Sequence, residues 1–72
     1  MIDLSCFTSS TEGLRYFGAN DYLITDAGKY YAVHVAFMDD AQENVTREES
    51  YAASSLSTAI ATIEALERGE EV

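Results

Sequence analysis

Residues 22–37 read YLITDAGKYYAVHVAF, with two apolar runs on either side of a turn. The runs, residues 22–25 and 30–37, are rich in β-branched and aromatic side chains, which favour strands. Gly28 lies between them and can adopt the positive φ angle that a tight hairpin turn requires. The stretch therefore predicts an antiparallel hairpin at the centre of the fold.

The segments before and after this hairpin carry weaker strand patterns. Residues 45–51 predict a third strand, and residues 14–17 predict either a short strand or one turn of helix. Residues 2–7 alternate weakly, which leaves open whether this segment joins the sheet. The polar residues 8–13 and 39–44 predict loops.

The C-terminal segment predicts an amphipathic helix. Its apolar stripe consists of Leu56, Ala59, Ile60, Ile63 and Leu66. Ser54 or Ser55 can cap the start of the helix, and Gly69 stands where a left-handed C-terminal cap belongs. Glu64, Glu67 and Glu71 are expected to form an outward ridge, and residues 69–72 a frayed tail.

These elements predict one α+β domain over residues 1–72. We expect an antiparallel sheet of three to four strands, with one C-terminal amphipathic helix packed on one face. The helix should cover the side formed by Tyr31, Val33, Val35 and Phe37. The other side, with Tyr30, Ala32, His34, Ala36 and Met38, would be covered by the N-terminal segment, by a second copy or by a target.

The chain is strongly acidic, and this restricts its partners. Thirteen carboxylates oppose four cations, Arg15, Lys29, Arg47 and Arg68, for a formal charge of −9. Binding to DNA or RNA depends on Lys and Arg neutralising phosphates, and these four cations are scattered. The composition therefore argues against direct nucleic-acid binding and favours a basic protein or nucleoprotein partner.

The chain has a single cysteine, Cys6, so no disulfide can form within it. This fits a reducing compartment and a buried structural thiol. Residues 1–7 lack the basic and apolar regions of a signal peptide, and no apolar run is long enough to cross a bilayer. We therefore expect a cytoplasmic protein that does not bind membranes.

No group of residues in the sequence matches a catalytic or metal-binding pattern. His34 stands among apolar strand residues, and nothing in the sequence brings it close to Cys6. Asp39, Asp40 and Glu43 lack the glycine and the spacing of a calcium loop. We expect a protein that is not an enzyme, with no catalytic residue, metal site or cofactor.

The acidic groups are the strongest candidates for partner binding. We expect Asp39, Asp40, Glu43, Glu48 and Glu49 to supply the electrostatics, with Glu64 and Glu67 as the alternative on the helix. Tyr22 or Tyr30 would anchor the contact, because tyrosine is enriched at interface hot spots. The competing interpretation is that the acidity only keeps a small protein soluble.

In general character the chain resembles the small acidic inhibitors encoded by phages, of the anti-CRISPR or DNA-mimic anti-restriction type. The shared features are one short α+β domain, strong negative charge, the hairpin over residues 22–37 and the helix over residues 56–68. The resemblance rests on no residue-by-residue motif. It implies a protein–protein inhibitor, acting in the host cytoplasm, that blocks a nuclease or a CRISPR effector. The alternative is a small structural or regulatory homodimer.

Overall fold

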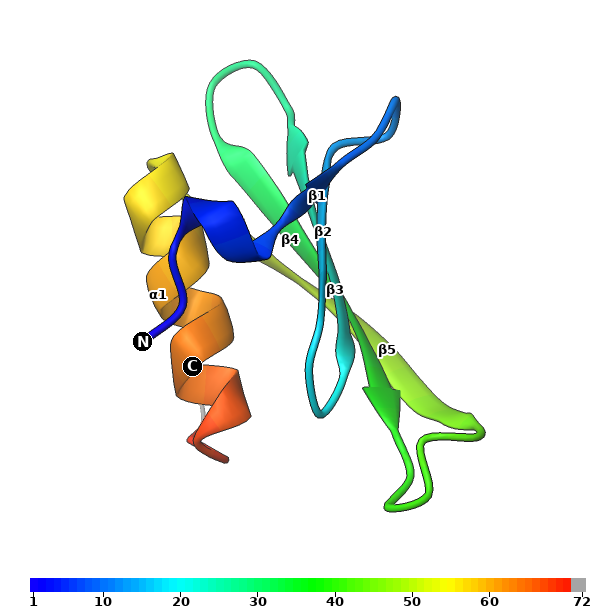
Figure 1. Cartoon of the computed structure of the whole chain (residues 1–72). Helices are drawn as coiled ribbons and strands as arrows, with labels where there is room; N and C mark the ends of the chain where they lie inside the picture. Colours follow the sequence, from blue (N-terminus) through cyan, green and yellow to red (C-terminus); the bar gives the residue numbers. More distant parts are fainter. Residues whose placement is uncertain (71–72) are drawn as a thin grey trace.

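The computed structural model describes residues 1–70 as one five-stranded sheet and one α-helix (Figure 1). The elements are the 3₁₀ helix η1 (Leu4–Cys6), β1 (Thr8–Ser9), β2 (Leu14–Phe17), β3 (Asp21–Asp26), β4 (Tyr31–Met38), β5 (Val45–Ala53) and α1 (Leu56–Glu67). Each strand pairs antiparallel with the next one in sequence, in the order β1-β2-β3-β4-β5. The α+β class is therefore confirmed, but the sheet has five strands rather than the expected three to four.

The β3–β4 hairpin confirms the central prediction. Thr25 pairs with Ala32, and the Ala27 amide donates to the Tyr30 carbonyl at 3.0 Å across the turn. Gly28 adopts a φ of 94°, and its amide donates to the Asp26 carboxylate at 2.8 Å. The local turn chemistry therefore sets the register of the two central strands.

The N-terminal segment differs from the strand that its weak alternation suggested. The Asp3 carboxylate accepts a hydrogen bond from the Ser5 amide at 3.0 Å and caps η1. The extra strand comes instead from the predicted loop, where Thr8–Ser9 pairs with β2. The chain reverses at Gly13, where a Cβ atom would lie 2.1 Å from the Ile24 carbonyl oxygen. Only glycine permits this close approach of β3.

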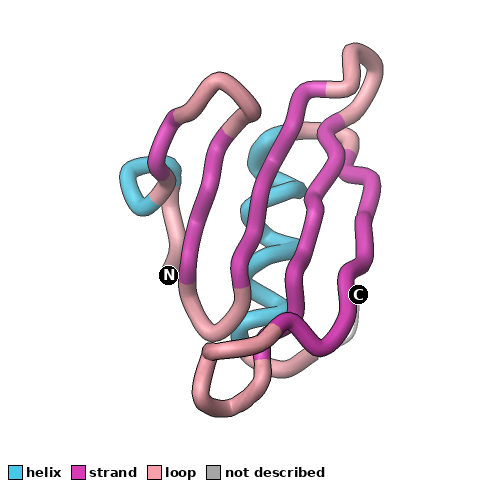
Figure 2. The backbone as a smooth tube through the Cα atoms, turned by 90° about the vertical axis from the view of Figure 1, so that its right-hand side faces the viewer, coloured by secondary structure: helices cyan, strands magenta, loops and turns pink. Residues whose placement is uncertain are grey.

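Helix α1 lies against one face of the sheet (Figure 2). Its apolar stripe packs against the core on that side. Ala59 and Ile63 are buried with Val33 and Val35, as the periodicity predicted. The Ser55 hydroxyl caps the helix by accepting from the Thr58 amide at 3.2 Å. The core therefore forms between α1 and the sheet face that carries Val33 and Val35.

The end of α1 is closed by a Schellman motif. Gly69 has a φ of 79° and its amide donates to the Leu66 carbonyl, while the Glu70 amide donates to the Ala65 carbonyl at 2.9 Å. Gly69 and Glu70 are thus tied to the helix, and the rest of the predicted frayed tail, residues 71–72, lies outside the described residues. Within residues 1–70 no helix has the length and apolar character needed to cross a membrane.

The opposite face of the sheet, here called the open face, carries Ala32, His34 and Ala36 from β4. The N-terminal segment lies on the helix side instead: Ile2 and Phe7 pack against the core, and the Phe7 ring is 5.5 Å from that of Tyr16 (Figure 1). The open face is therefore not covered by the N-terminal segment, which was one of the three expected covers.

Candidate functional site

The β4–β5 connection presents three acidic side chains at one end of the molecule. The Asp39 carboxylate accepts from the Glu43 amide at 3.0 Å and from the Asn44 side-chain amide at 3.1 Å. These hydrogen bonds lower the pKa of Asp39 below its ordinary value of 3.8. Asp39 therefore shapes the loop, while the exposed side chains of Asp40 and Glu43 project from it.

Strand β5 continues this acidic surface. Glu48 and Glu49 are exposed and, as neighbours in a strand, point to opposite faces of the sheet. Glu49 pairs with Arg47 at 2.7 Å, and the Arg47 guanidinium lies 4.0 Å from the centre of the Phe37 ring. Within residues 1–70 Glu48 makes no ion pair.

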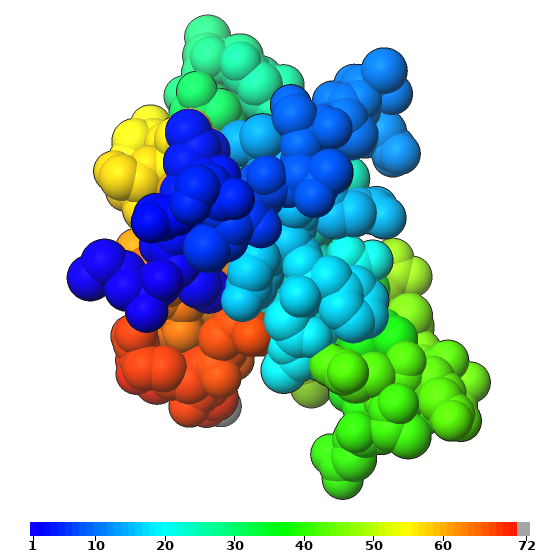
Figure 3. All heavy atoms as spheres, viewed as in Figure 1, coloured from blue at the N-terminus to red at the C-terminus, as the bar shows by residue number. Residues whose placement is uncertain are grey.

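We call Asp39, Asp40, Glu43, Glu48 and Glu49 the acidic end. Figure 3 shows residues 39–49, coloured green, as a lobe that stands away from the helix. The only cation in this segment is Arg47, which already contacts Glu49 and Phe37. Asp39, Asp40 and Glu43 thus lie in the projecting loop, where Asp39 also has a structural role. Glu48 and Glu49 follow on β5, opposite Ala36 and Val35, with their side chains on opposite faces of the sheet.

The predicted acidic ridge on the helix does not form, because Glu67 turns inward. Its two carboxylate oxygens accept from the Ala19 amide at 3.0 and 3.1 Å, and one also accepts from the Tyr22 hydroxyl at 2.5 Å. Glu64 lies 4.0 Å from Arg68, which also binds Glu70 at 2.6 Å. Glu67 is thus a structural residue, and Glu71 lies outside the described residues.

Tyr22, expected as a surface anchor, is fully buried in the core. Its hydroxyl reaches Glu67 and Asn20, and burial together with the bond to Glu67 raises the pKa of the phenol. The expectation is wrong because Tyr22 alternates in phase with Ile24, so both point toward α1. In this conformation a partner cannot contact the Tyr22 ring.

Tyr30 is exposed, with 46% of its surface accessible, and lies in the β3–β4 turn. That turn and the acidic loop lie at opposite ends of β4 (Figure 1). An eight-residue strand spans about 25 Å. Tyr30 and the acidic loop can therefore meet one partner only if that partner extends along the whole strand.

His34 forms a cross-strand chain of side chains on the open face. One imidazole nitrogen lies 3.1 Å from the Thr25 hydroxyl, and the other lies 3.2 Å from the Ser50 hydroxyl. A serine–histidine pair of this kind is activated in hydrolases by a carboxylate on the second nitrogen. Here Thr25 takes that position. The three side chains therefore link β3, β4 and β5 without reproducing the catalytic triad. The pairing was not foreseen, since it depends on the β4–β5 register.

Cys6 does not join His34, and it is not the buried thiol that was expected. It lies in η1, exposed, with its sulfur 3.7 Å from the Asp3 carboxylate. Because η1 lies on the helix side and His34 on the open face, the two side chains are separated by the sheet. Within residues 1–70 no three His, Cys, Asp or Glu side chains are grouped to hold a metal ion.

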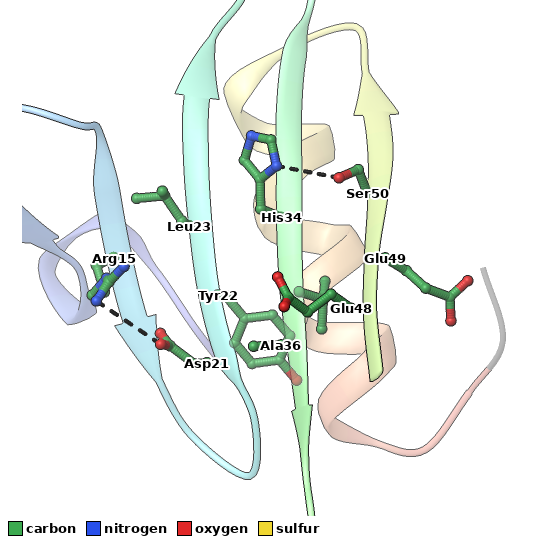
Figure 4. A pocket seen from close by; sticks show the side chains of 10 residues that line it. Arg15, Asp21, Tyr22, Leu23, His34, Ala36, Glu48, Glu49 and Ser50 are labelled. Atoms are coloured by element: carbon green, nitrogen blue, oxygen red, sulfur yellow. Dashed lines mark hydrogen bonds and ion pairs between the residues drawn. The ribbon is translucent and has the colours of Figure 1, made fainter. Parts of the chain in front are cut away.

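The open face carries a shallow groove of about 520 Å³ (Figure 4). Its side chains include Arg15, Asp21, His34, Glu48 and Ser50. Arg15 lies 3.9 Å from one Asp21 oxygen, while the other oxygen is buried without a hydrogen-bond partner in residues 1–70. The groove thus carries charges of both signs, and Ala36 is part of its lining. Such a lining suits contact with a polar surface of another molecule.

Lowering the pH is expected to release the Asp39 carboxylate from the Glu43 amide. Because the pKa of Asp39 is lowered in the folded protein, its hydrogen bonds are complete at neutral pH and are lost as the pH falls through the lowered pKa. The ¹³C NMR shift of the Asp39 side-chain carboxyl should therefore titrate with a midpoint below 3.8, and the Glu43 amide shift should show a component with the same midpoint. Asp39→Asn should abolish this titration. A midpoint at or above 3.8 would contradict the assigned hydrogen bonds.

Comparison of the chain with protein-family models, with curated proteins and with solved structures finds no match in any of the three.

Proposed function

We propose that this protein is a non-enzymatic inhibitor whose acidic end docks on a basic surface of a nucleic-acid-handling protein. The target class is a nuclease or a nucleoprotein complex such as a CRISPR effector. The observation that carries this proposal is a projecting β4–β5 loop with three carboxylates, continued along β5 by Glu48 and Glu49, in a segment with one cation, Arg47. Such a surface complements a cationic groove, speeds encounter and helps to set the orientation of the complex.

The cations support a protein partner over nucleic acid itself. Arg15, Arg47 and Arg68 each lie within 4.0 Å of a carboxylate. A phosphate would have to compete with these carboxylates for each guanidinium, and the net charge of −9 repels nucleic acid at longer range. The acidic end would instead occupy the surface on which the target binds nucleic acid.

A pull-down from bacterial lysate tests the proposal. The protein is used as bait at low ionic strength, the column is eluted with a salt step, and the eluate is identified by mass spectrometry. We expect a nuclease or CRISPR complex that elutes with salt, because screening weakens contacts between exposed charges. Recovery of the bait alone, or of a partner that resists the salt step, would contradict electrostatic docking.

The second candidate function is a structural or regulatory homodimer. It is favoured by one observation, the open face with Ala32, His34 and Ala36, which the N-terminal segment leaves uncovered. Two such faces would pack as a sheet-on-sheet sandwich. Sedimentation equilibrium separates the candidates, because a monomer at all concentrations excludes the homodimer.

A further inference from the structure

The outer edge of β5 is a second surface of the acidic end. β5 is nine residues long and stands last in the sheet, so within residues 1–70 only β4 pairs with it. Residues 45–50 are all exposed. An edge strand of this length presents a row of backbone groups that a further strand can bind.

The direction of these backbone groups follows from the hairpin. The Ala27–Tyr30 hydrogen bond closes the β3–β4 turn, and hydrogen-bonded pairs alternate along an antiparallel ladder. The backbone groups of Val33 and Val35 therefore point toward β5, where the register places Tyr51 and Glu49 opposite them. By the same alternation, the intervening residues of β5 direct their amides and carbonyls outward, away from β4. These residues are Glu48, Ser50 and Ala52.

The side chains along this edge determine which strand it can accept. Glu48 lies on the open face and Glu49 on the helix face, so an added strand would meet a carboxylate on each side. Directly opposite side chains of paired strands lie about 5 Å apart, close enough for opposite charges to attract and like charges to repel. The edge is therefore complementary to an extended segment that carries Lys or Arg.

The same charges disfavour a second copy of this chain. Antiparallel pairing of β5 with itself, centred on Glu48 or on Glu49, places a carboxylate directly opposite its own copy. The net charge of −9 on each protomer adds repulsion. The net charge and these two registers thus disfavour self-association, whereas a basic strand is attracted to the edge.

We propose that β5 binds an extended basic segment of the partner as an added sixth strand. The proposal rests on the proposed function and specifies how the acidic end engages its target. Backbone hydrogen bonds to the outward groups of Glu48, Ser50 and Ala52 would supply affinity. The two glutamates would select lysine and arginine.

The test uses a synthetic peptide of alternating lysine and valine, blocked at both ends, and the intact isotope-labelled protein. We expect NMR hydrogen exchange of the outward amides of Glu48, Ser50 and Ala52 to slow at least about tenfold at saturating peptide. A glutamate–valine peptide should not bind. A lysine–valine peptide with alternate N-methylated amides should bind about tenfold more weakly, because it cannot complete the ladder.

A pair of protein variants gives an independent measure. Ser50→Pro removes an outward amide and no backbone hydrogen bond to β4, so peptide binding should weaken about tenfold. The hydroxyl contact with His34 is lost in Ser50→Pro and in Ser50→Ala alike. Ser50→Ala keeps the amide and should bind as the wild type does. If Ser50→Pro does not fold, the N-methylated peptide provides the same comparison with the protein unchanged.

Three results would overturn strand addition. In the first, hydrogen exchange of the outward amides is unchanged when the lysine–valine peptide is bound. In the second, the glutamate–valine peptide binds as tightly as the lysine–valine peptide. In the third, the outward amides are already protected without peptide, in a homodimer. Absence of peptide binding would also overturn it. In each case a target that the pull-down releases with salt would still support the proposed function, because that function requires docking of the acidic end but no added strand.

Discussion

Replacing Glu67 with alanine is expected to destabilise the protein by about 2–3 kcal/mol, a large share of the stability of a small domain. The carboxylate is the acceptor for the Ala19 amide and for the hydroxyl of the fully buried Tyr22. Both donors lose this acceptor in the variant, and the desolvation of the Tyr22 hydroxyl is then no longer compensated. Thermal unfolding should show the melting temperature falling by about 10–20 °C.

Glu64→Ala is the matched control, because it removes the same charge from the same helix. Glu64 has only a long contact with Arg68, at 4.0 Å, so its loss should change the free energy of unfolding by less than about 0.5 kcal/mol. Tyr22→Phe should cost about 1 kcal/mol alone and little more when added to Glu67→Ala. Equal effects of Glu64→Ala and Glu67→Ala would contradict the structural role of Glu67.

Charge reversal at the acidic end, Asp40→Lys with Glu43→Lys, is expected to weaken target binding by about 30-fold at low ionic strength. Each reversed contact contributes about 1 kcal/mol at an exposed site, and 1.4 kcal/mol corresponds to a factor of ten. Asp39 is left intact because its carboxylate holds the loop. Binding to the target captured in the pull-down is measured by calorimetry.

The matched control reverses two charges elsewhere, Glu12→Lys with Glu64→Lys. Glu12 is exposed before β2 and Glu64 is partly exposed on α1, so the net charge changes equally while the acidic end stays intact. The control should bind within about threefold of the wild type, since only long-range steering is altered. A larger loss of affinity in the control would indicate that the target binds at the helix and not at the acidic end.

Local patterns in the sequence predicted the elements whose structure depends on nearby residues. The hairpin follows from Gly28 and its flanking apolar runs, and α1 follows from its stripe together with the Ser55 cap. β1 could not be predicted in this way, because Thr8–Ser9 has no apolar pattern. Its pairing depends on the chain reversal between β1 and β2, where the Ser10 amide donates to the Gly13 carbonyl at 2.8 Å.

The positions of Tyr22 and Glu67 were predictable from periodicity, although their residue types suggested a surface anchor and an outward acidic ridge. Tyr22 is two residues before buried Ile24 in a strand, and Glu67 is four residues after buried Ile63 in a helix. Both spacings place the residue on the core side. What the pattern cannot supply is the Ala19 amide opposite Glu67, because the β2–β3 turn reaches the helix end only in the folded chain.

The salt dependence of target binding tests the central claim most directly. The dissociation constant is measured over a series of salt concentrations for the wild type and for the Asp40→Lys, Glu43→Lys variant. Docking of the acidic end predicts a steep weakening with salt for the wild type and a shallower one for the variant, since fewer exposed charges are then screened. Identical affinities and identical salt slopes for the two proteins would contradict it.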